Sequence, residues 1–399
     1  MTQTHSSAPA ILWSPVWALA AMQGAITLMW VTYNLYLPKF LEQFGFPVAA
    51  ATALIIAENI LSAGVEPLMG SFSDRTQRWL GTRFPFIATG VIVASVLFMA
   101  IPAIALFGAQ VGTVMRSILI IALIAWALSM TIFRSPALSL LGRYAINSQM
   151  PLAASILTLV GAVTGAIGPV ANQALLKLGA PLTFTIGSLV LLGAATLLRS
   201  VAPPAPNSDT VAETHEPLDW SRLGLIFGAG MGIAIGFRLM LTMVPLRLAE
   251  SAGSGAPSWI LLVLFVAIAL SALPTGTLAV RLGNSRAMLI GLGALAIALS
   301  LCLINLSSAG VAALTAILGV AFSLVSNGTL PFALSLVPPV RAGLATGLFF
   351  GGGALGVSLF FSLFQKLNTS QGLVGGAIAF LFAAGCIALC QKRVNSLMY

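Results

Sequence analysis

The stretch Glu66–Phe86, EPLMGSFSDRTQRWLGTRFPF, separates two apolar segments of membrane length. It carries four charged residues within ten positions: Asp74, Arg75, Arg78 and Arg83. Because charges are costly in hydrocarbon, we expect a loop at a membrane surface. Its arginines place this loop in the cytoplasm, where short loops collect Lys and Arg. We expect Gly70 to end the preceding helix, and Asp74 to accept hydrogen bonds from N–H groups at a helix start.

The composition agrees with a chain that crosses the membrane many times. Of its 399 residues, 59% are hydrophobic and only 7% are charged, and the mean hydropathy is +1.04. A soluble domain cannot bury that much apolar surface, so the sequence predicts an all-α polytopic membrane protein in contact with a lipid bilayer. The net charge of +9 sits in the connections between apolar segments. The preference of cytoplasmic loops for Lys and Arg explains this positive charge, so we expect no nucleic-acid partner.

Twelve membrane spans can be drawn along the chain. If the N-terminus is cytoplasmic, most Lys and Arg residues outside the spans fall on the cytoplasmic side, so we expect both termini in the cytoplasm. The spans are 12–37, 48–70, 84–107, 117–141, 151–176, 180–200, 221–247, 257–281, 286–305, 310–336, 341–364 and 372–391.

The linker at 201–220 divides these spans into two sets of six. It holds four prolines and four of the nine acidic residues, which is typical of a solvated connection. We therefore expect an N-terminal half at 1–200 and a C-terminal half at 221–399. A weak repeat supports the division, because the segment Gly276–Arg286 follows the eighth span as the charged stretch follows the second. This repeat has Val280 where the first half has its aspartate.

The pattern Gly70-x-x-x-Asp74-Arg75 resembles the signature that follows the second span in the major facilitator superfamily. The resemblance implies two six-helix halves that alternately open a central site to either side of the membrane. In this superfamily the first, fourth, seventh and tenth spans line the site. The residues to which the resemblance assigns a gating role are Gly70, Asp74, Arg75, Arg78, Gly81 and Arg83.

The longer pattern from Glu66 to Phe86 resembles one branch of that superfamily, the sucrose transporters and the glycoside–pentoside–hexuronide:cation symporters. Thr82 and Phe84 depart from it, since this branch has arginines at those positions. The resemblance implies a monomeric transporter of a sugar or glycoside, coupled to protons or another cation, in a bacterial inner membrane. We expect no cofactor and no enzymatic activity.

Glycines in the eleventh span indicate close helix packing. They recur as Gly343-x-x-x-Gly347-x-x-x-Gly351, a spacing that lets helix backbones approach each other. In the superfamily this helix lies against the second span. The resemblance therefore makes these glycines the packing partners of Gly70.

Polar side chains inside the spans are candidates for substrate binding and proton coupling, since burying them in a bilayer is costly. A sugar or similar polyol needs amide and guanidinium donors together with an aromatic face. The residues that match this chemistry are Gln23, Trp30, Asn34, Arg134, Arg238 and Asn327. For Gln23, Asn34 and Asn327, hydrogen bonds between helices would explain the sequence equally well.

Two carboxyl groups in the second span are candidates for proton coupling. Glu58 lies near its middle, where burial favours the neutral form of a carboxyl group. Glu66 lies nearer the cytoplasm, at the depth of Arg134, and we expect these two residues to form an ion pair. The acids that the sucrose-transporter branch has in the first and fourth spans are missing here, which makes Glu58 the best proton carrier.

Two other functions fit the same sequence. One is an exporter of drugs or organic anions, favoured by the cavity arginines and by Gly161-x-x-x-Gly165-x-x-Gly168-Pro169, which partly resembles a motif of drug/proton antiporters. The other is a non-transporting assembly factor, like the pigment-delivery proteins of photosynthetic membranes that resemble this branch. Both histidines, His5 and His215, lie outside the spans, which argues against pigment ligation.

Overall fold

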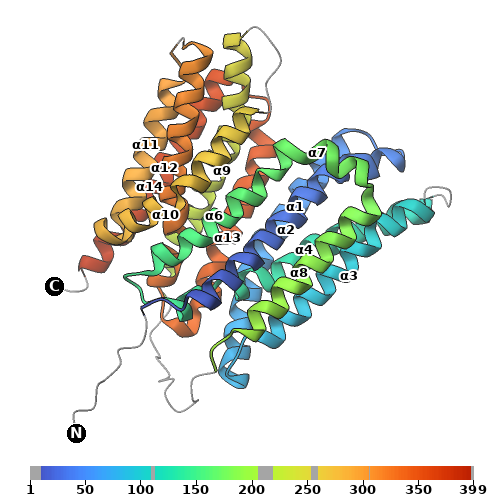
Figure 1. The fold of residues 1–399 in the computed structure, drawn as a ribbon, viewed down its shortest axis with the longest axis horizontal. Helices are drawn as coiled ribbons and strands as arrows, with labels where there is room; N and C mark the ends of the chain where they lie inside the picture. The colour runs from blue at the N-terminus through green and yellow to red at the C-terminus, as the bar shows by residue number, and fades with distance from the viewer. Residues whose placement is uncertain (1–9, 109–112, 205–218, 253–258, 305, 397–399) are drawn as a thin grey trace.

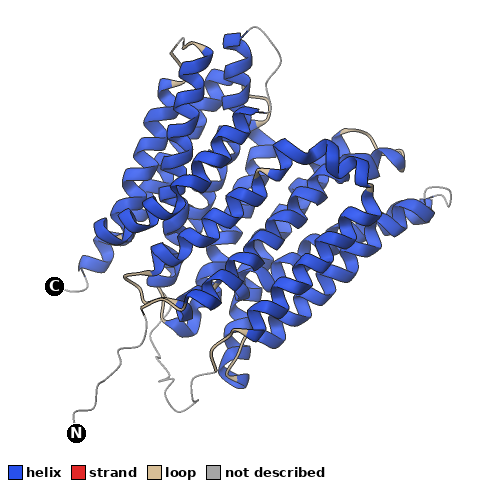
Figure 2. Ribbon diagram, in the orientation of Figure 1, coloured by secondary structure: helices blue, strands red, loops and turns tan. Residues whose placement is uncertain are grey.

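The computed structural model describes residues 10–108, 113–204, 219–252, 259–304 and 306–396, and these are almost entirely helical (Figure 2). A short 3₁₀ turn, Pro339–Arg341, precedes α13, and a π-helical segment, Phe360–Phe364, extends it. The helices are α1 Trp13–Gln43, α2 Ala49–Leu80, α3 Phe84–Gly108, α4 Thr113–Leu138, α5 Leu141–Tyr144, α6 Met150–Gly165, α7 Ile167–Leu178, α8 Ala180–Ser200, α9 Trp220–Ala252, α10 Trp259–Leu282, α11 Asn284–Leu301, α12 Ser308–Ser335, α13 Ala342–Leu359 and α14 Thr369–Ser396.

Eleven of these helices are long and apolar enough to cross a membrane. The helices α6 and α7, which meet at an angle of 46°, together make a twelfth span. The prediction of an all-helical membrane protein with twelve spans is therefore confirmed. Most of the predicted linker lies outside the described residues.

The charged stretch that opened the sequence analysis is not a loop, and that prediction is wrong. The helix α2 continues through it to Leu80, so Gly70 lies inside the helix, and Asp74, Arg75 and Arg78 occupy its last turns. At 1.5 Å per residue, this helix of 32 residues is about 48 Å long and exceeds the roughly 30 Å hydrocarbon core. The charged turns can thus remain helical outside the hydrocarbon. Gly81, with φ of 69°, ends the helix.

The helices pack as two bundles, α1–α8 and α9–α14, whose long axes run side by side (Figure 1). Each bundle has its own large cluster of buried apolar side chains. The helix α1 begins and α14 ends at the same side of the molecule, which we call the terminal side (Figure 1). The bundles meet along two seams, one between α2 and α13 and the other between α6 and α10.

Glycines bring α2 and α13 into backbone contact at the first seam. A Cβ atom at Gly70 would lie only 2.1 Å from the carbonyl oxygen of Gly343, and one at Gly347 would lie 2.4 Å from that of Glu66. Gly351 packs in the same way on Ala63. The expected pairing of Gly70 with the glycine run of the eleventh span is confirmed.

The carboxylate of Asp74 binds the two bundles together at the terminal-side end of this seam. Its two oxygens accept hydrogen bonds from the backbone N–H groups of Gly343 and Leu344, each at 2.9 Å. These donors lie in the first turn of α13, where the helix dipole favours a negative charge. Arg83 forms an ion pair with the same carboxylate, and the two side chains are 1% and 5% exposed. The expected helix cap is present.

Asp74→Asn should loosen the terminal-side contact, because it leaves Arg83 buried without its anionic partner. Removing one member of a buried ion pair costs about 3 kcal/mol, so we expect roughly a hundredfold shift toward a conformation open on the terminal side. The measurement is thiol labelling at Leu334→Cys in a protein whose three native cysteines are replaced. Leu334 is 7% exposed and lies against Gly142 of the other bundle, so labelling requires the bundles to separate.

The double variant Asp74→Asn/Arg83→Gln should label more slowly than Asp74→Asn, since no unpaired charge remains buried. Asp219→Asn is the control, because Asp219 pairs with Arg222 near the surface and is 41% exposed. Equal labelling rates with and without Asp74→Asn would contradict this account of the contact.

Candidate functional site

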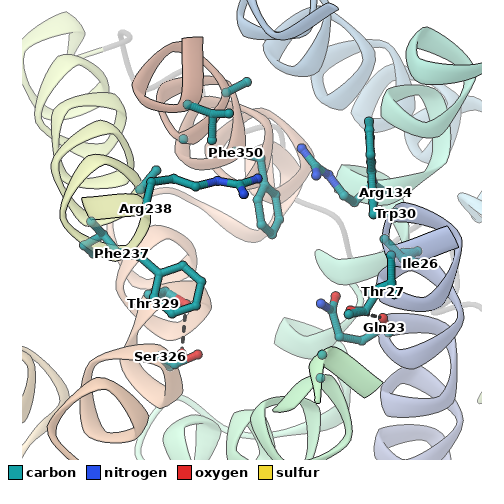
Figure 3. A pocket seen from close by; sticks show the side chains of 18 of the residues that line it. Gln23, Ile26, Thr27, Trp30, Arg134, Phe237, Arg238, Ser326, Thr329 and Phe350 are labelled. Atoms are coloured by element: carbon teal, nitrogen blue, oxygen red, sulfur yellow. Dashed lines mark hydrogen bonds between the residues drawn. The ribbon is translucent and has the colours of Figure 1, made fainter. Parts of the chain in front are cut away.

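A cavity of about 850 Å³ lies between the two bundles (Figure 3). Its wall includes residues of α1, α2 and α4 from one bundle and of α9, α12 and α13 from the other. On the terminal side the cavity ends near Leu138, Ala154 and Leu330. Beyond these residues, on the same side, the Asp74 contact joins the bundles. The volume suits a small organic molecule, since ligand pockets commonly measure 300–1,000 Å³.

Arg134 of α4 reaches into this cavity from the first bundle, and Glu66 neutralises it. Its Nη2 donates to Oε1 of Glu66, and the hydroxyl of Ser135 donates to the other carboxylate oxygen. Glu66 is fully buried, whereas the side chain of Arg134 is 21% exposed. The expected Glu66–Arg134 ion pair is therefore confirmed, and this paired carboxylate holds the guanidinium in the cavity wall.

Arg238 of α9 reaches into the cavity from the second bundle, and its guanidinium points toward Arg134 across the space (Figure 3). No carboxylate among the described residues lies within ion-pair distance of it. Its Cζ lies over the ring of Phe361, 5.9 Å from the ring centroid. Phe350 of α13 lies between the two arginines in Figure 3, with its centroid 4.7 Å from Cζ of Arg134. The cavity thus contains one guanidinium without a fixed counter-ion.

Glu58 of α2 belongs to the cavity wall, although it is only 1% exposed. The phenol of Tyr33 donates a hydrogen bond to its Oε1. The ring of Tyr33 lies in turn against Trp126 and Trp30, with centroids 4.4 Å and 5.7 Å away. This aromatic cluster fixes the phenol and separates the carboxyl group from most of the solvent in the cavity.

Three other predicted residues lie in the wall formed by α1. Gln23, Trp30 and Asn34 all line the cavity. The amide of Asn34 donates to the carbonyl of Trp30 at 2.8 Å, within its own helix, and its oxygen remains available to a ligand. The helical spacing of these residues therefore indicated the correct face of α1.

Asn327 does not line the cavity, and its predicted role in binding is wrong. It is fully buried, and its amide donates to the carbonyl of Ala272 at 2.8 Å and to the hydroxyl of Thr275 at 2.9 Å. Ser323, one turn earlier, also contacts Thr275, at 3.0 Å. The polar stripe on α12 therefore faces α10, where its hydrogen bonds join two helices of the same bundle.

The cavity wall also contains residues that the sequence analysis missed. Ser326 and Thr329 of α12 supply hydroxyl groups (Figure 3), and Phe322 of the same helix stacks on Phe237 with the ring centroids 4.2 Å apart. Hydroxyl groups are too common in membrane helices to indicate a site on their own. Their only signal was their position beside Asn327 on a cavity helix.

The residues assigned to the gate lie outside the cavity. Asp74 and Arg83 are buried at the seam, while Arg75 and Arg78 are exposed on the last turns of α2. Gly70 lies in the helix contact, and Gly81 ends α2. The structure therefore separates the cavity residues from a second group that joins the bundles.

Solved structures with the same fold include transporters of different solutes. The human organic anion transporter MFSD10 (TETRAN) matches with a TM-score of 0.69 and 15% identity, over 96% of this chain and 100% of that one. A bacterial homologue of the iron transporter ferroportin in an outward-facing state matches with a TM-score of 0.76 and 16% identity, over 95% and 100%. The transporter FucP in its outward conformation matches with a TM-score of 0.69 and 14% identity, over 94% and 98%.

At these identities the likeness concerns the fold alone. The sequence itself also matches a family model, over residues 88–360 and thus over more than half of the chain. This match covers α3 to α13 and includes most of the cavity wall. The chain is an integral membrane protein that belongs to the Major Facilitator Superfamily.

Proposed function

We propose that this protein is a secondary transporter that moves a small hydroxylated organic anion, such as a sugar acid, by alternating access. The observation that carries the proposal is Arg238, a cavity guanidinium with no carboxylate partner among the described residues. An unpaired charge at membrane depth is costly, and an anionic ligand would offset that cost. The planar fork of arginine binds carboxylates and phosphates in a bidentate manner.

The remaining wall suits the uncharged part of such a solute. Gln23, Asn34, Ser326 and Thr329 can exchange hydrogen bonds with hydroxyl groups. Trp30, Phe237 and Phe350 offer aromatic faces, against which the apolar face of a sugar ring packs. The negative charge distinguishes this proposal from transport of a neutral sugar. MFSD10 is an organic anion transporter, which supports this substrate class.

The described conformation fits one state of the proposed cycle. The terminal side is closed by the Asp74 contact, and the cavity reaches past the midpoint of α9 toward the opposite side. If both termini are cytoplasmic, as their flanking basic residues favour, this is an outward-facing state. Rocking of the two bundles would break the Asp74 contact and open the same site to the cytoplasm.

We further propose that Glu58 carries the coupling proton. Its carboxyl group borders the cavity and is separated from bulk water, so it can exchange a proton with cavity water when the site is open. Tyr33 stabilises the carboxylate through its hydrogen bond. Glu66 is a weaker candidate, because Arg134 and Ser135 already occupy its two oxygens.

Arg238→Lys should weaken binding of the anion by about 10- to 100-fold, because lysine cannot form the paired hydrogen bonds of a guanidinium with a carboxylate. The measurement is titration of the purified protein with matched probes: glucuronate against glucose, and glycerol 3-phosphate against glycerol. We expect the charged member of a pair to bind the wild-type protein and the neutral member to bind much more weakly.

Arg222→Lys is the matched control, since Arg222 lies on the same helix but pairs with Asp219 outside the cavity. Size-exclusion profiles and thermal unfolding should show that both variants fold. Two outcomes would contradict the proposed substrate class: equal affinity for charged and neutral probes, and wild-type anion affinity in Arg238→Lys.

Glu58→Gln should abolish accumulation of the bound anion driven by a pH gradient, while exchange of labelled for unlabelled anion continues. Glutamine keeps the size of the side chain but cannot release a proton. The measurement compares the two modes in proteoliposomes, with Glu42→Gln as control, since Glu42 is an exposed carboxyl group at the end of α1. Wild-type accumulation in Glu58→Gln would place the coupling proton elsewhere.

A further inference from the structure

A second cavity, of about 410 Å³, lies on the terminal side within the first bundle. It shares no wall residue with the central cavity. It forms where the connection between α2 and α3, the short helix α5 and the end of α8 come together. Its wall consists of Thr82, Phe84, Arg143, Arg199, Ala202, Pro203 and Pro204.

Two guanidinium groups that pair with none of the described carboxylates dominate this second cavity. Arg143 is half-buried, and its Nη2 donates to the carbonyl oxygen of Pro204 at 3.3 Å. Arg199 lies over the ring of Phe84, with its Cζ 4.9 Å from the centroid. No described carboxylate forms an ion pair with either arginine. Asp74, in the last turns of the helix that precedes Thr82, is already bound by Arg83 and by α13.

The other polar groups of this wall suit an anion with several acceptor oxygens. The hydroxyl oxygen of Thr82 accepts the N–H of Phe84 at 3.2 Å, so its own proton can be donated to a ligand. The carbonyl oxygen of Pro204 accepts a hydrogen bond from Arg143 and so orients its guanidinium. Two guanidiniums and a hydroxyl match a phosphate group, whose oxygens can accept from all three.

The position of the cavity indicates where such a phosphate comes from. Trp79 and Leu80, at the end of α2, are 88% and 60% exposed, and they precede Thr82 in the chain by three and two residues. Exposed tryptophan at a helix end is typical of the level of lipid headgroups. The helix α3 begins and α8 ends beside the same cavity. The pocket is therefore located at the boundary between the hydrocarbon and water.

We propose that this second cavity binds the phosphate of an anionic phospholipid headgroup. Basic pockets between membrane helices hold such headgroups by charge and by hydrogen bonds to phosphate oxygens. An anionic headgroup is favoured over a zwitterionic one, because the described residues of the wall include two cations and no carboxylate that could bind an ammonium group. The site is independent of the substrate proposed for the central cavity.

The test compares a variant of the pocket with a variant of equal charge elsewhere. Arg143→Gln/Arg199→Gln removes both guanidiniums. Arg281→Gln/Arg286→Gln removes two exposed arginines at the terminal side of the other bundle. Native mass spectrometry of the purified proteins with phosphatidylglycerol or phosphatidylcholine counts retained lipid and measures its dissociation constant.

We expect wild-type protein and the control variant to retain one phosphatidylglycerol, and the pocket variant to bind it at least tenfold more weakly. Phosphatidylcholine should bind more weakly than phosphatidylglycerol to the wild type. If the double variant fails to fold, the single variant Arg199→Gln replaces it, because Arg199 is exposed. This single variant should also lower the affinity for phosphatidylglycerol.

Competition with inorganic phosphate distinguishes a site for a lipid headgroup from a site for a soluble anion. If inorganic phosphate displaces phosphatidylglycerol at equal concentration, the site takes a free anion and the lipid assignment is overturned. Equal retention of phosphatidylglycerol by the pocket and control variants would overturn the site itself.

Discussion

One carboxylate, that of Asp74, joins the two halves of this protein at their terminal side. It belongs to α2, accepts hydrogen bonds from amide groups in the first turn of α13 and binds Arg83, and the side chains of Asp74 and Arg83 are buried. The contact is possible because Gly70 and Gly343 let the two backbones meet. Any motion that opens the terminal side must break charged hydrogen bonds in a buried place. This cost makes closure a distinct state, which alternating access requires.

The second seam is built differently. Gly276 of α10 packs closely on Ser155 of α6, as Gly70 packs on Gly343, but Val280 stands where the first half has its aspartate. The two seams thus share close packing, whereas the carboxylate contact with a helix start belongs to the first. Beyond the seams, α6 and α7 bend by 46° and α13 passes into a π-helical segment. These irregular segments border the cavity. Straight helices at the same places would extend the close contacts of the seams.

Hydropathy was sufficient to predict the spans, because a span depends on one helix and the lipid around it. The spacing of small residues was sufficient to predict the glycine contact, because that contact depends on a helix and its nearest neighbour. The Glu66–Arg134 pair was predictable from depth alone. Periodicity could not show which neighbour a polar stripe faces, and the Asn327 stripe faces α10. It also could not show that the charged turns of α2 stay helical beyond the hydrocarbon. That Arg238 has no partner among the described carboxylates depends on the tertiary arrangement of these groups, which no local sequence pattern contains.

The central claim is that the two bundles rock about the cavity, so that one side opens as the other closes. Spin-label distance measurements in lipid test it directly, with labels at Arg78→Cys and Arg286→Cys on the terminal side and at Glu42→Cys and Lys366→Cys on the opposite side, all of which are exposed positions. The account predicts two populations for each pair, and conditions that lengthen the terminal-side distance should shorten the opposite one. A single unchanging distance on both sides, or distances that lengthen together, would contradict it.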